Sequence, residues 1–487
     1  MLSLMALTSC LAFVALLLCF SFSVNPQPNH YPTASAPTSW TNSPSLPQNF
    51  TSSSGEIVRP LLRLNTTRGM SFATGFYCFP PCKSFFLSIY ILYIDYPVYE
   101  GNVKYIPPQV IWSANRARPV SENATLQLTS QHGLTLRDSD GSLVWSTSVV
   151  NRSVAGINVT EAGNLVLFDI NNSTIWQSFD HPTDCLVMGQ TLAEGMNITA
   201  NSSSIDLVES QFYLTLRAYG LYGYFKSNHT LEYYYNIVYT TSNGTILVDK
   251  SIKFMNGNLT MFSTLSDTDN ALPIFTFPPA KSIQYMRLES DGHLRLYDYD
   301  GFQWEMVSDL FNMDNCDYPT VCGHYGICNN GQCTCPAGTS GNYFKPVDNR
   351  RAELGCYAIT NITCQDVNSH LLLELNNVSY FSDVDNVAFN TTDEESCKRA
   401  CLGDCNCKAA LFQTLNGNLS DGNCLTLSEQ LELVSVLSTV PVKPKQSRFR
   451  TGHATQMEER EICGTLYYNL PVDGNVSVLA TGLEGLN

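Results

Sequence analysis

Cysteines in the middle of the chain have a type and spacing that can do chemistry, and that chemistry is disulfide formation. They are Cys316, Cys322, Cys328, Cys333, Cys335 and Cys356, within the run CDYPTVCGHYGICNNGQCTCP. This run has interleaved glycines and too few apolar residues to build a core, so it must be held by disulfides. Disulfides persist outside the cytosol, which predicts an extracellular, modular protein.

A second cysteine cluster follows. Its members are Cys364, Cys397, Cys401, Cys405, Cys407 and Cys424. The segment ESCKRACLGDCNCKAALF predicts a short helix on which Cys397 and Cys401 share one face. Such a set permits three bridges in about fifteen connectivities, and the sequence does not choose among them. Zinc binding is the alternative for both clusters, and disulfides are favoured in a chain that carries a signal peptide.

Besides Cys10 and Cys19 of the predicted signal peptide, three further cysteines precede these clusters. Cys78 and Cys82 lie close together in FYCFPPCKSFF, and Cys185 stands alone. We expect a local bridge between the first two. Such a bridge would leave the Cys185 thiol for another domain or another chain.

Composition bounds the class of protein. The chain has 487 residues, which is enough for roughly three domains of about 150 residues each. Charged residues make up only 14%, and the net charge of −16 argues against nucleic-acid binding, because a phosphate backbone requires a basic surface. The acidity is explained by the solubility of a secreted protein.

The N-terminus predicts export. Residues 1–24 form an apolar run, typical of a secretory signal peptide, although it carries no Lys or Arg. An uncleaved membrane anchor is the alternative, and no later run reaches the roughly 20 apolar residues of a membrane span. About seventeen N-x-S/T sequons predict glycosylation of exposed loops. They include Asn65, Asn123, Asn158, Asn197, Asn228, Asn361 and Asn390.

The chain divides by composition and pattern. Residues 25–56 are rich in Pro, Ser, Thr and Asn, and predict an extended linker. From Ile57 onward, short alternating strands separated by Gly and Asn turns predict an all-β fold.

An internal repeat supports this fold. Leu134, Leu136, Asp138 and Trp145 recur 31 residues later as Leu165, Leu167, Asp169 and Trp176, and more loosely as Leu294, Leu296, Asp298 and Trp304. Alternating leucines lie on one strand face, so we expect stacked units to pool their tryptophans in one core.

A family resemblance emerges from specific motifs. IWSANRARPV, SLVWSTS, AGNLVLFD and WQSFDHPTDCLVMGQ resemble the bulb-type lectin module of plants. The order of lectin, EGF-like and PAN/apple modules resembles the ectodomain of plant G-type lectin S-receptor-like serine/threonine-protein kinases.

The resemblance implies a mainly β fold with two β-prism domains, a disulfide-rich EGF-like module and a small α+β PAN/apple module. The implied ranges are a lectin domain at 57–190, a degenerate lectin-like (S-locus glycoprotein-like) domain at 191–312, an EGF-like module at 313–358, a PAN/apple module at 359–430 and a tail at 431–487.

Bulb-type lectins bind mannose through Gln, Asp, Asn, Val and Tyr at alternate positions of a strand, where polar groups pair with sugar hydroxyls. The first copy has Thr129, Gln131, Gly133, Thr135 and Arg137 at these positions. The second has Thr160, Ala162, Asn164, Val166 and Phe168. The third has Glu289, Asp291, His293, Arg295 and Tyr297. The remaining matches are Asn164, Val166, the near match Phe168, Asp291 and Tyr297, so we expect a lectin fold whose sugar pockets are degenerate.

Other candidate sites have simpler explanations. His181 and Asp184 in FDHPTD have no nucleophile beside them, and the segment is typical of a turn. Asn312, Asp314 and Asn315 lack the spacing of a calcium-binding EGF-like module. The sequence therefore predicts neither a catalytic residue nor a metal or other cofactor.

Kinase motifs are absent from the sequence, which has no Gly-rich loop, H-R-D or D-F-G. The segment GTLYYNLPVDGNVSVLATGLEGLN loosely resembles the strands that carry the kinase Val-Ala-x-Lys, with Thr481 at the lysine position. It is read either as the remnant of a receptor-kinase gene or as a disordered tail.

The sequence therefore predicts a non-enzymatic glycoprotein of the cell wall space, or of the plasma membrane if an anchor is retained. It would recognise an extracellular protein or glycan ligand and form a homodimer or a heterodimer with related receptors. The alternatives are a truncated gene model of a receptor kinase and an active mannose-binding defence lectin.

Overall fold

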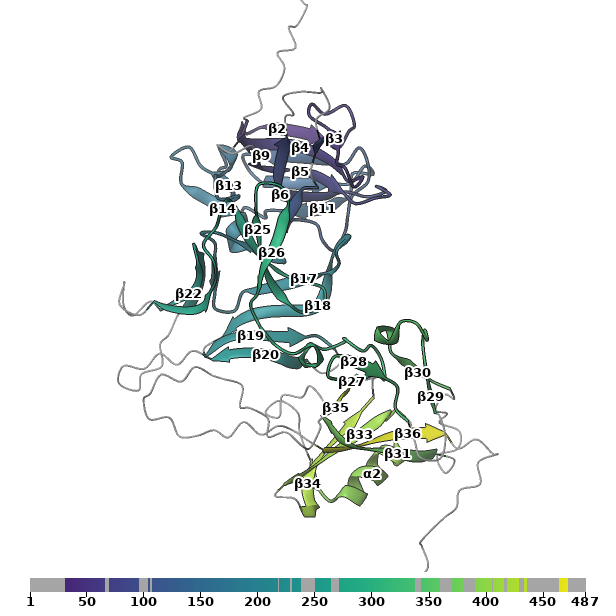
Figure 1. Cartoon of the computed structure of the whole chain (residues 1–487). Coiled ribbons are helices and arrows are strands. Elements are labelled where there is room, and N and C mark those ends of the chain that lie inside the picture. Colours follow the sequence, from purple (N-terminus) through teal and green to yellow (C-terminus); the bar gives the residue numbers. More distant parts are fainter. Residues whose placement is uncertain are drawn as a thin grey trace, which may run out of the picture. The chain divides into compact units, whose positions relative to one another are not determined.

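The computed structural model of the chain is mainly β (Figure 1). It describes residues 31–65, 70–95, 104–105, 107–217, 219–227, 230–237, 250–263, 271–337, 343–359, 370–379, 390–404, 406–415, 418–428, 433–435 and 464–471. The chain forms two compact units, Met1–His181 and Pro182–Asn487. The predicted signal peptide lies outside the described residues.

The first unit is built from three antiparallel sheets. Sheet IA contains β3 (Phe50–Thr51), β4 (Ile57–Asn65), β5 (Met70–Cys78), β6 (Phe86–Asp95), β7 (Lys104–Tyr105) and β8 (Gln109–Ser113). Sheet IB contains β2 (Thr38–Thr41), β9 (Thr125–Thr129), β10 (Gly133–Arg137) and β11 (Leu143–Ser146). Sheet IC contains β1 (Thr33–Ser35), β12 (Gly156–Val159), β13 (Leu165–Phe168) and β14 (Thr174–Gln177), followed by the short helix η1 (Ser178–Asp180).

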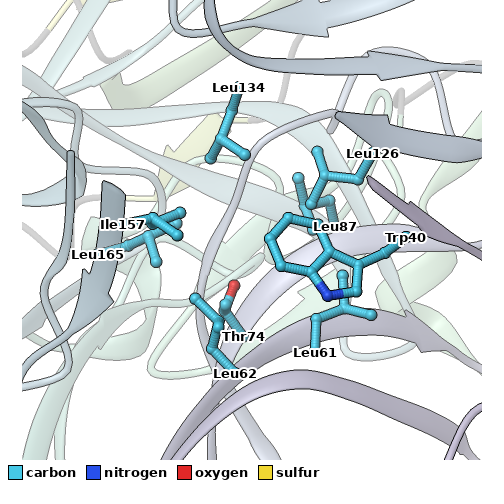
Figure 2. Close-up of a pocket in the computed structure, with 9 residues that line it drawn as sticks. All are labelled: Trp40, Leu61, Leu62, Thr74, Leu87, Leu126, Leu134, Ile157 and Leu165. Carbon is cyan, nitrogen blue, oxygen red and sulfur yellow. The ribbon is translucent and has the colours of Figure 1, made fainter. Parts of the chain in front are cut away.

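The predicted linker at 25–56 is wrong for its described part, because this segment adds one strand to each sheet. β1 pairs with β12, β2 with β9 and β3 with β4. Composition misses these strands because each is short and lies at a sheet edge, where one inward side chain suffices and proline is tolerated. Trp40 of β2 is that side chain in sheet IB, and it lines the apolar interior together with leucines of all three sheets (Figure 2).

The interior of the first unit is filled by side chains. The space that Figure 2 shows has a volume of about 10 Å³, which is hardly room for one water molecule. Nine residues line it: Trp40, Leu61, Leu62, Thr74, Leu87, Leu126, Leu134, Ile157 and Leu165. The alternating leucines of the repeat therefore form a packed core and leave no ligand cavity there.

A tryptophan triangle joins the three sheets of the first unit. The ring centroids of Trp112, Trp145 and Trp176 lie 5.9–6.0 Å apart in each pair, with edge-to-face geometry. The pooling expected for Trp145 and Trp176 is confirmed. The third member is Trp112 of β8, whereas Trp304 contacts Tyr285 and Tyr299 in the second unit. The loose third repeat therefore belongs to a different prism.

The second unit begins with another three-sheet prism. Sheet IIA contains β17 (Asn197–Ser203), β18 (Asp206–Arg217), β19 (Gly220–Phe225) and β20 (Leu231–Ile237). Sheet IIB contains β16 (Thr191–Ala193), β21 (Lys250–Met255), β22 (Asn258–Ser263) and β23 (Leu272–Thr276). Sheet IIC contains β15 (Cys185–Val187), β24 (Gln284–Leu288), β25 (Leu294–Tyr299) and β26 (Trp304–Asp309).

Both prisms have the same topology. In each, the first three strands go one to each sheet, and the strands that follow complete the sheets in the reverse order. Five strands complete sheet IA, and three complete each of the other sheets. Since β15 already belongs to sheet IIC, the second prism begins before residue 190, where the sequence placed the domain boundary. Two β-prism domains are thus present, as the fold prediction states.

The EGF-like module follows the second prism. It contains the short helices η2 (Asn315–Asp317) and η3 (Ala352–Leu354), and the strands β27 (Ile327–Asn329), β28 (Gln332–Thr334), β29 (Phe344–Pro346) and β30 (Cys356–Ala358). Three disulfides hold it: Cys316–Cys328, Cys322–Cys333 and Cys335–Cys356. The predicted disulfide character of this run is confirmed.

The PAN/apple module contains the one α-helix of the described residues, α2 (Glu394–Gly403). Its strands are β31 (His370–Ser379), β32 (Asn390–Thr392), β33 (Ala409–Leu415), β34 (Asn418–Leu427), β35 (Leu433–Ser435) and β36 (Gly464–Pro471). Asp393 caps α2 by accepting a hydrogen bond from the Ser396 amide. Cys397 and Cys401 share one face of the helix, as predicted. Both are buried, and they bridge to Cys424 and Cys407. Cys364 and Cys405 lie outside the described residues.

The tail at 431–487 does not separate from this module. β36 pairs with both β31 and β33 inside the same sheet, and β35 pairs with β27 and β31. The prediction of a disordered tail is wrong for residues 464–471, because a strand that closes a sheet had no local signal beyond its alternation. The interpretation of the tail as a kinase remnant stays a prediction. Thr481 lies outside the described residues.

Candidate carbohydrate-binding faces

The second copy of the sugar motif lies on the outward face of sheet IC. The Asn164 side chain is 8% exposed, and its amide group donates to Gln177 Oε1 at 2.9 Å. Its carbonyl oxygen accepts from Ser178 Oγ at 3.1 Å and from the Phe179 amide at 3.2 Å. Both ends of the side chain are therefore occupied by the end of β14 and the start of η1, and Asn164 holds this turn against β13.

The two apolar positions of this copy lie on β13. Val166 is opposite Asn158 and Gln177, and Phe168 is opposite Gly156 and Thr174. A Cβ atom on Gly156 would come within 2.6 Å of the Phe168 ring, so glycine is required for the ring to lie across β12. Val166 and Phe168 are both half-buried. They keep the apolar part of the motif, but the polar residues that would pair with sugar hydroxyls are missing.

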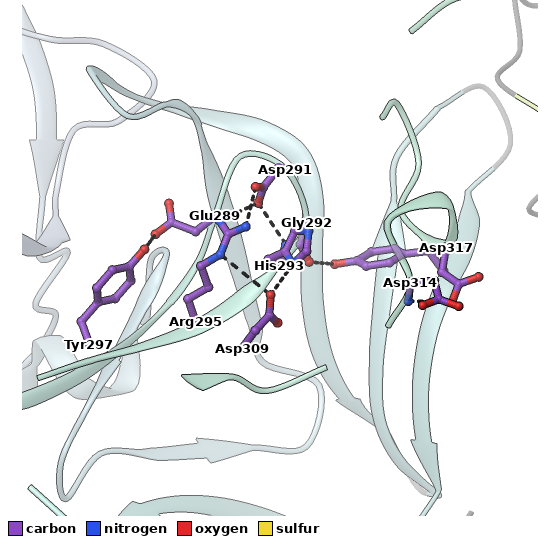
Figure 3. Close-up of polar contacts among 10 residues, drawn as sticks. Glu289, Asp291, Gly292, His293, Arg295, Tyr297, Asp309, Asp314 and Asp317 are labelled. Atoms are coloured by element: carbon purple, nitrogen blue, oxygen red, sulfur yellow. Dashed lines mark hydrogen bonds and ion pairs between the residues drawn. The ribbon is translucent and has the colours of Figure 1, made fainter. Parts of the chain in front are cut away.

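The third copy lies on sheet IIC, where polar groups pair with one another (Figure 3). Tyr297 donates to Glu289 at 2.6 Å. Arg295 pairs with Asp291 at 2.9 Å and approaches Asp309 at 3.9 Å. Each carboxylate in Figure 3 that could accept from a sugar hydroxyl thus already has a partner within the protein.

The electrostatics of this copy follow from the same contacts. Burial lowers the pKa of Arg295, but the ion pair with Asp291 outweighs it, and the pKa lies above its ordinary value. Burial and the Glu289 carboxylate raise the pKa of Tyr297. His293 pairs with Asp309 and stacks on Tyr318 of the EGF-like module, with the ring centroids 3.6 Å apart. This cluster links the second prism to the EGF-like module.

The first copy has no sugar-binding character. Gly133 occupies a left-handed conformation with φ of 65°, and Thr147 lies against it. Arg137 donates to the Gly141 carbonyl in its own hairpin. Gln131 lies in the exposed turn before β10.

The residues of FDHPTD have structural roles. The His181 ring stacks on Trp176, and its carbonyl accepts from the Trp112 indole at 2.7 Å. Asp184 is buried, accepts from Asn201 at 2.9 Å and pairs with Arg287 at 3.2 Å. The expectation that this segment is structural agrees with these contacts.

Cys185 completes the buried Asp184 and Arg287 cluster. Its sulfur accepts from Arg287 at 3.2 Å, and burial raises the pKa of the thiol. Cys78 and Cys82 form the expected local bridge. The suggestion that Cys185 reaches another chain is wrong, because the side chain is only 2% exposed and lies on β15 of the second prism.

The sequons are distributed over several elements. Asn123 lies in an exposed turn, Asn197 is exposed on β17 and Asn158 is half-buried on β12. The side chains of Asn65, Asn228, Asn361 and Asn390 lie outside the described residues. Within the described ranges, no group of His, Cys, Asp and Glu side chains has the arrangement of a metal site.

Sequence reasoning missed a tyrosine-rich face on sheet IIA. Tyr222 and Tyr224 alternate on β19, and Tyr213 of β18 stacks on Tyr224 with centroids 5.3 Å apart. The guanidinium of Arg217 lies 4.5 Å from the Tyr224 ring centroid. The alternation of polar aromatics along LYGYF was the signal that could have revealed this face.

Comparison with known proteins supports the resemblance. The family model for D-mannose binding lectin matches residues 109–205, and the model for the S-locus glycoprotein domain matches residues 205–343. Both are lectin or glycoprotein domains, and neither is a catalytic domain. In the described part of the chain, no helix has the length and apolar character needed to cross a membrane.

Relatives of this chain include several plant proteins. An epidermis-specific secreted glycoprotein, EP1, of Daucus carota is 31% identical over 262 residues, covering 46% of this chain and 67% of the relative. Two G-type lectin S-receptor-like serine/threonine-protein kinases of Arabidopsis thaliana are each 27% identical and cover 68% and 70% of this chain. The chain spans only 37% and 42% of the length of these kinases.

Among solved structures, Citrobacter koseri AztD matches at 8% identity and covers 51% of this chain and 81% of that one. The TM-score of 0.12 is too low to indicate a shared fold. The two matched domains overlap the two prisms. The chain belongs to the family of plant proteins with bulb-type lectin and S-locus glycoprotein domains, which includes EP1-like glycoproteins and G-type lectin S-receptor-like kinases.

Proposed function

We propose that this protein is an extracellular, non-enzymatic glycoprotein that recognises a protein or glycan ligand through the surface of its prisms and small modules. The observation that carries the proposal is the internal pairing of the sugar-motif residues on the two prisms. The polar groups of Asn164, Asp291 and Tyr297 all form hydrogen bonds or ion pairs with neighbouring side chains. Recognition then rests on shape and surface chemistry at loops, and not on the mannose pockets.

The disulfides support an extracellular compartment. Six bridges hold the described modules, and the EGF-like module has almost no other means of staying folded. The secreted relatives support the same compartment. A homodimer, or a heterodimer with related receptors, is the assembly that we propose for it.

Localisation tests this proposal. A chain tagged near its C-terminus and expressed in plant cells should appear in wall fluid with its cysteines oxidised. A cytoplasmic pool with free thiols would refute it. A pool that stays with membranes after a high-salt wash would favour a retained anchor.

A second candidate is the ectodomain of a receptor kinase, which the two kinase relatives favour. Transcript sequencing across the codons after Arg450 distinguishes the two. A longer reading frame with a hydrophobic span and a kinase domain supports the receptor, and a stop after Asn487 supports the secreted glycoprotein.

A further inference from the structure

One residue row crosses the outward face of sheet IIA, with one member on each strand. Asn197 of β17 is opposite Thr215 of β18, Thr215 is opposite Tyr222 of β19, and Tyr222 is opposite Tyr235 of β20. Directly opposite residues in antiparallel strands share a face. This row therefore places a sequon asparagine in line with two tyrosines.

The row faces away from the core. Leu214 and Leu221, the sequence neighbours of Thr215 and Tyr222, belong to the buried core of the prism. Asn197 is exposed, and the Tyr235 side chain is 43% exposed. The two end residues of the row, on the edge strands β17 and β20, are thus exposed to solvent.

The aromatic side chains in and beside the row are held in place by their neighbours. Tyr222 and Tyr224 have ring planes 15° apart, and the Arg217 guanidinium lies over both rings at 6.0 Å and 4.5 Å from their centroids. The Tyr224 hydroxyl donates to Glu232 at 2.9 Å. The aromatic rings are held in place by these contacts before any ligand arrives.

We propose that Asn197 carries an N-linked glycan whose core sugars pack along this row onto Tyr222 and Tyr235. The occupant is therefore the chain's own glycan. In the transfer step, the Asn197 side-chain nitrogen bonds to C1 of the first N-acetylglucosamine of a lipid-diphosphate-linked oligosaccharide. The bond from C1 to the diphosphate oxygen breaks with its electron pair, and the nitrogen loses one proton.

The dimensions and chemistry suit this occupant. Strands are spaced about 4.8 Å apart, so Tyr222 lies roughly 10 Å and Tyr235 roughly 14 Å from Asn197 across the sheet. A glycan core reaches over this distance. The apolar faces of its sugars pack on aromatic rings, and its hydroxyls accept from groups such as the Arg217 guanidinium.

Two other described sequons, Asn123 and Asn158, lack this arrangement. Asn123 lies in a turn with φ of 66° and has no cross-strand partner. Asn158 on β12 is opposite Thr33 on one side and Val166 on the other, so no aromatic ring lies in its row. Asn123 therefore serves as an internal control within the same molecule.

The glycan would cover the face of sheet IIA and withdraw it from partner binding. Ligand recognition would then fall to the other surfaces of the chain. The inference rests on the proposed export, because only exported chains meet the glycosylation machinery, and Asn123 separates the two claims.

Native deglycosylation tests the inference. The full chain, secreted from cultured eukaryotic cells, is treated under native conditions with a glycopeptide amidase in ¹⁸O-water, which converts each released asparagine to labelled aspartate. Mass spectrometry then gives a release rate for each site. We expect release at Asn197 to be roughly two- to tenfold slower than at Asn123, from the strength of aromatic packing.

Variants identify the cause of the protection. Tyr222→Ala should raise the Asn197 release rate toward that of Asn123, and Tyr235→Ala should raise it in part. Tyr357→Ala, at an exposed tyrosine of β30, should leave it unchanged. If Tyr222→Ala is not secreted, Tyr235→Ala decides the matter.

Three outcomes would overturn the inference. One is an unglycosylated Asn197 in a chain whose Asn123 is occupied. Another is equal release at the two sites, and the third is slow release that neither tyrosine variant changes. A chain that stays inside the cells with neither site glycosylated would overturn the proposed export as well.

Discussion

Asn164 provides the sharpest test of the idea that the sugar motif has become structural. Asn164→Ala removes the donation to Gln177 and the acceptor shared by Ser178 Oγ and the Phe179 amide. Each lost hydrogen bond costs about 1 kcal/mol net, and a buried amide left without a partner costs about 1–3 kcal/mol. We therefore expect the free energy of unfolding of the first unit to fall by roughly 2–4 kcal/mol.

Urea unfolding followed by tryptophan fluorescence measures this change. Trp40, Trp112, Trp145 and Trp176 lie in the first unit, so four of the five tryptophans report on it. With a slope of about 1–3 kcal/mol per M for a unit of this size, the midpoint should fall by roughly 1–2 M. Asn164→Asp keeps the acceptor and loses the donor, so its midpoint should lie between those of the other two proteins.

Gln131→Ala is the matched control, since Gln131 occupies an exposed motif position of the first copy. Its stability should change by less than about 0.5 kcal/mol. An Asn164→Ala midpoint equal to that of the control would refute the structural role. Loss of mannose binding without loss of stability would show that Asn164 still contacts sugar.

Other predictions follow from single contacts. Hydrogen bonds from Ser121 hold the pKa of Asp138 below its ordinary value of 3.8. Ionised Asp138 therefore stabilises the fold above about pH 4, and this contribution is lost as the pH falls through the lowered pKa. The urea midpoints of Asp138→Asn and the parent should differ at pH 7 and converge at low pH. Asn201 is a sequon asparagine whose buried amide donates to Asp184, so glycopeptide mapping should find it unmodified in secreted protein that carries a glycan at Asn123. Burial raises the pKa of Cys185, so its thiol should resist iodoacetamide in the native chain and react in guanidinium; rapid native labelling would contradict the buried position.

Much of the fold could be predicted because its signals are local. The repeat identified β10 and β13 through Leu134, Leu136, Leu165 and Leu167, which all point into the core. The helix α2 was predicted from its cysteine spacing. The disulfide knot followed from composition alone, because glycine-rich segments with few apolar residues have no other source of stability.

The missed elements depend on distant partners. β1 pairs through Ser35 with Gly156, and β36 pairs through Leu466 with Leu411, so neither pairing is visible in a short window. The same holds for the site. Gln177 of the neighbouring strand accepts a hydrogen bond from Asn164, and Asp309 of β26 pairs with Arg295. The partners of these motif positions are set by tertiary register, which a short stretch of sequence does not show.

Mannose titration of the whole, disulfide-intact chain tests the central claim most directly. Isothermal calorimetry with methyl α-mannoside should give no measurable heat of binding at millimolar sugar, because the polar groups of both partly matched copies are engaged within the protein. Saturable binding that Asn164→Ala or Asp291→Ala abolishes, in chains that remain folded, would contradict the account.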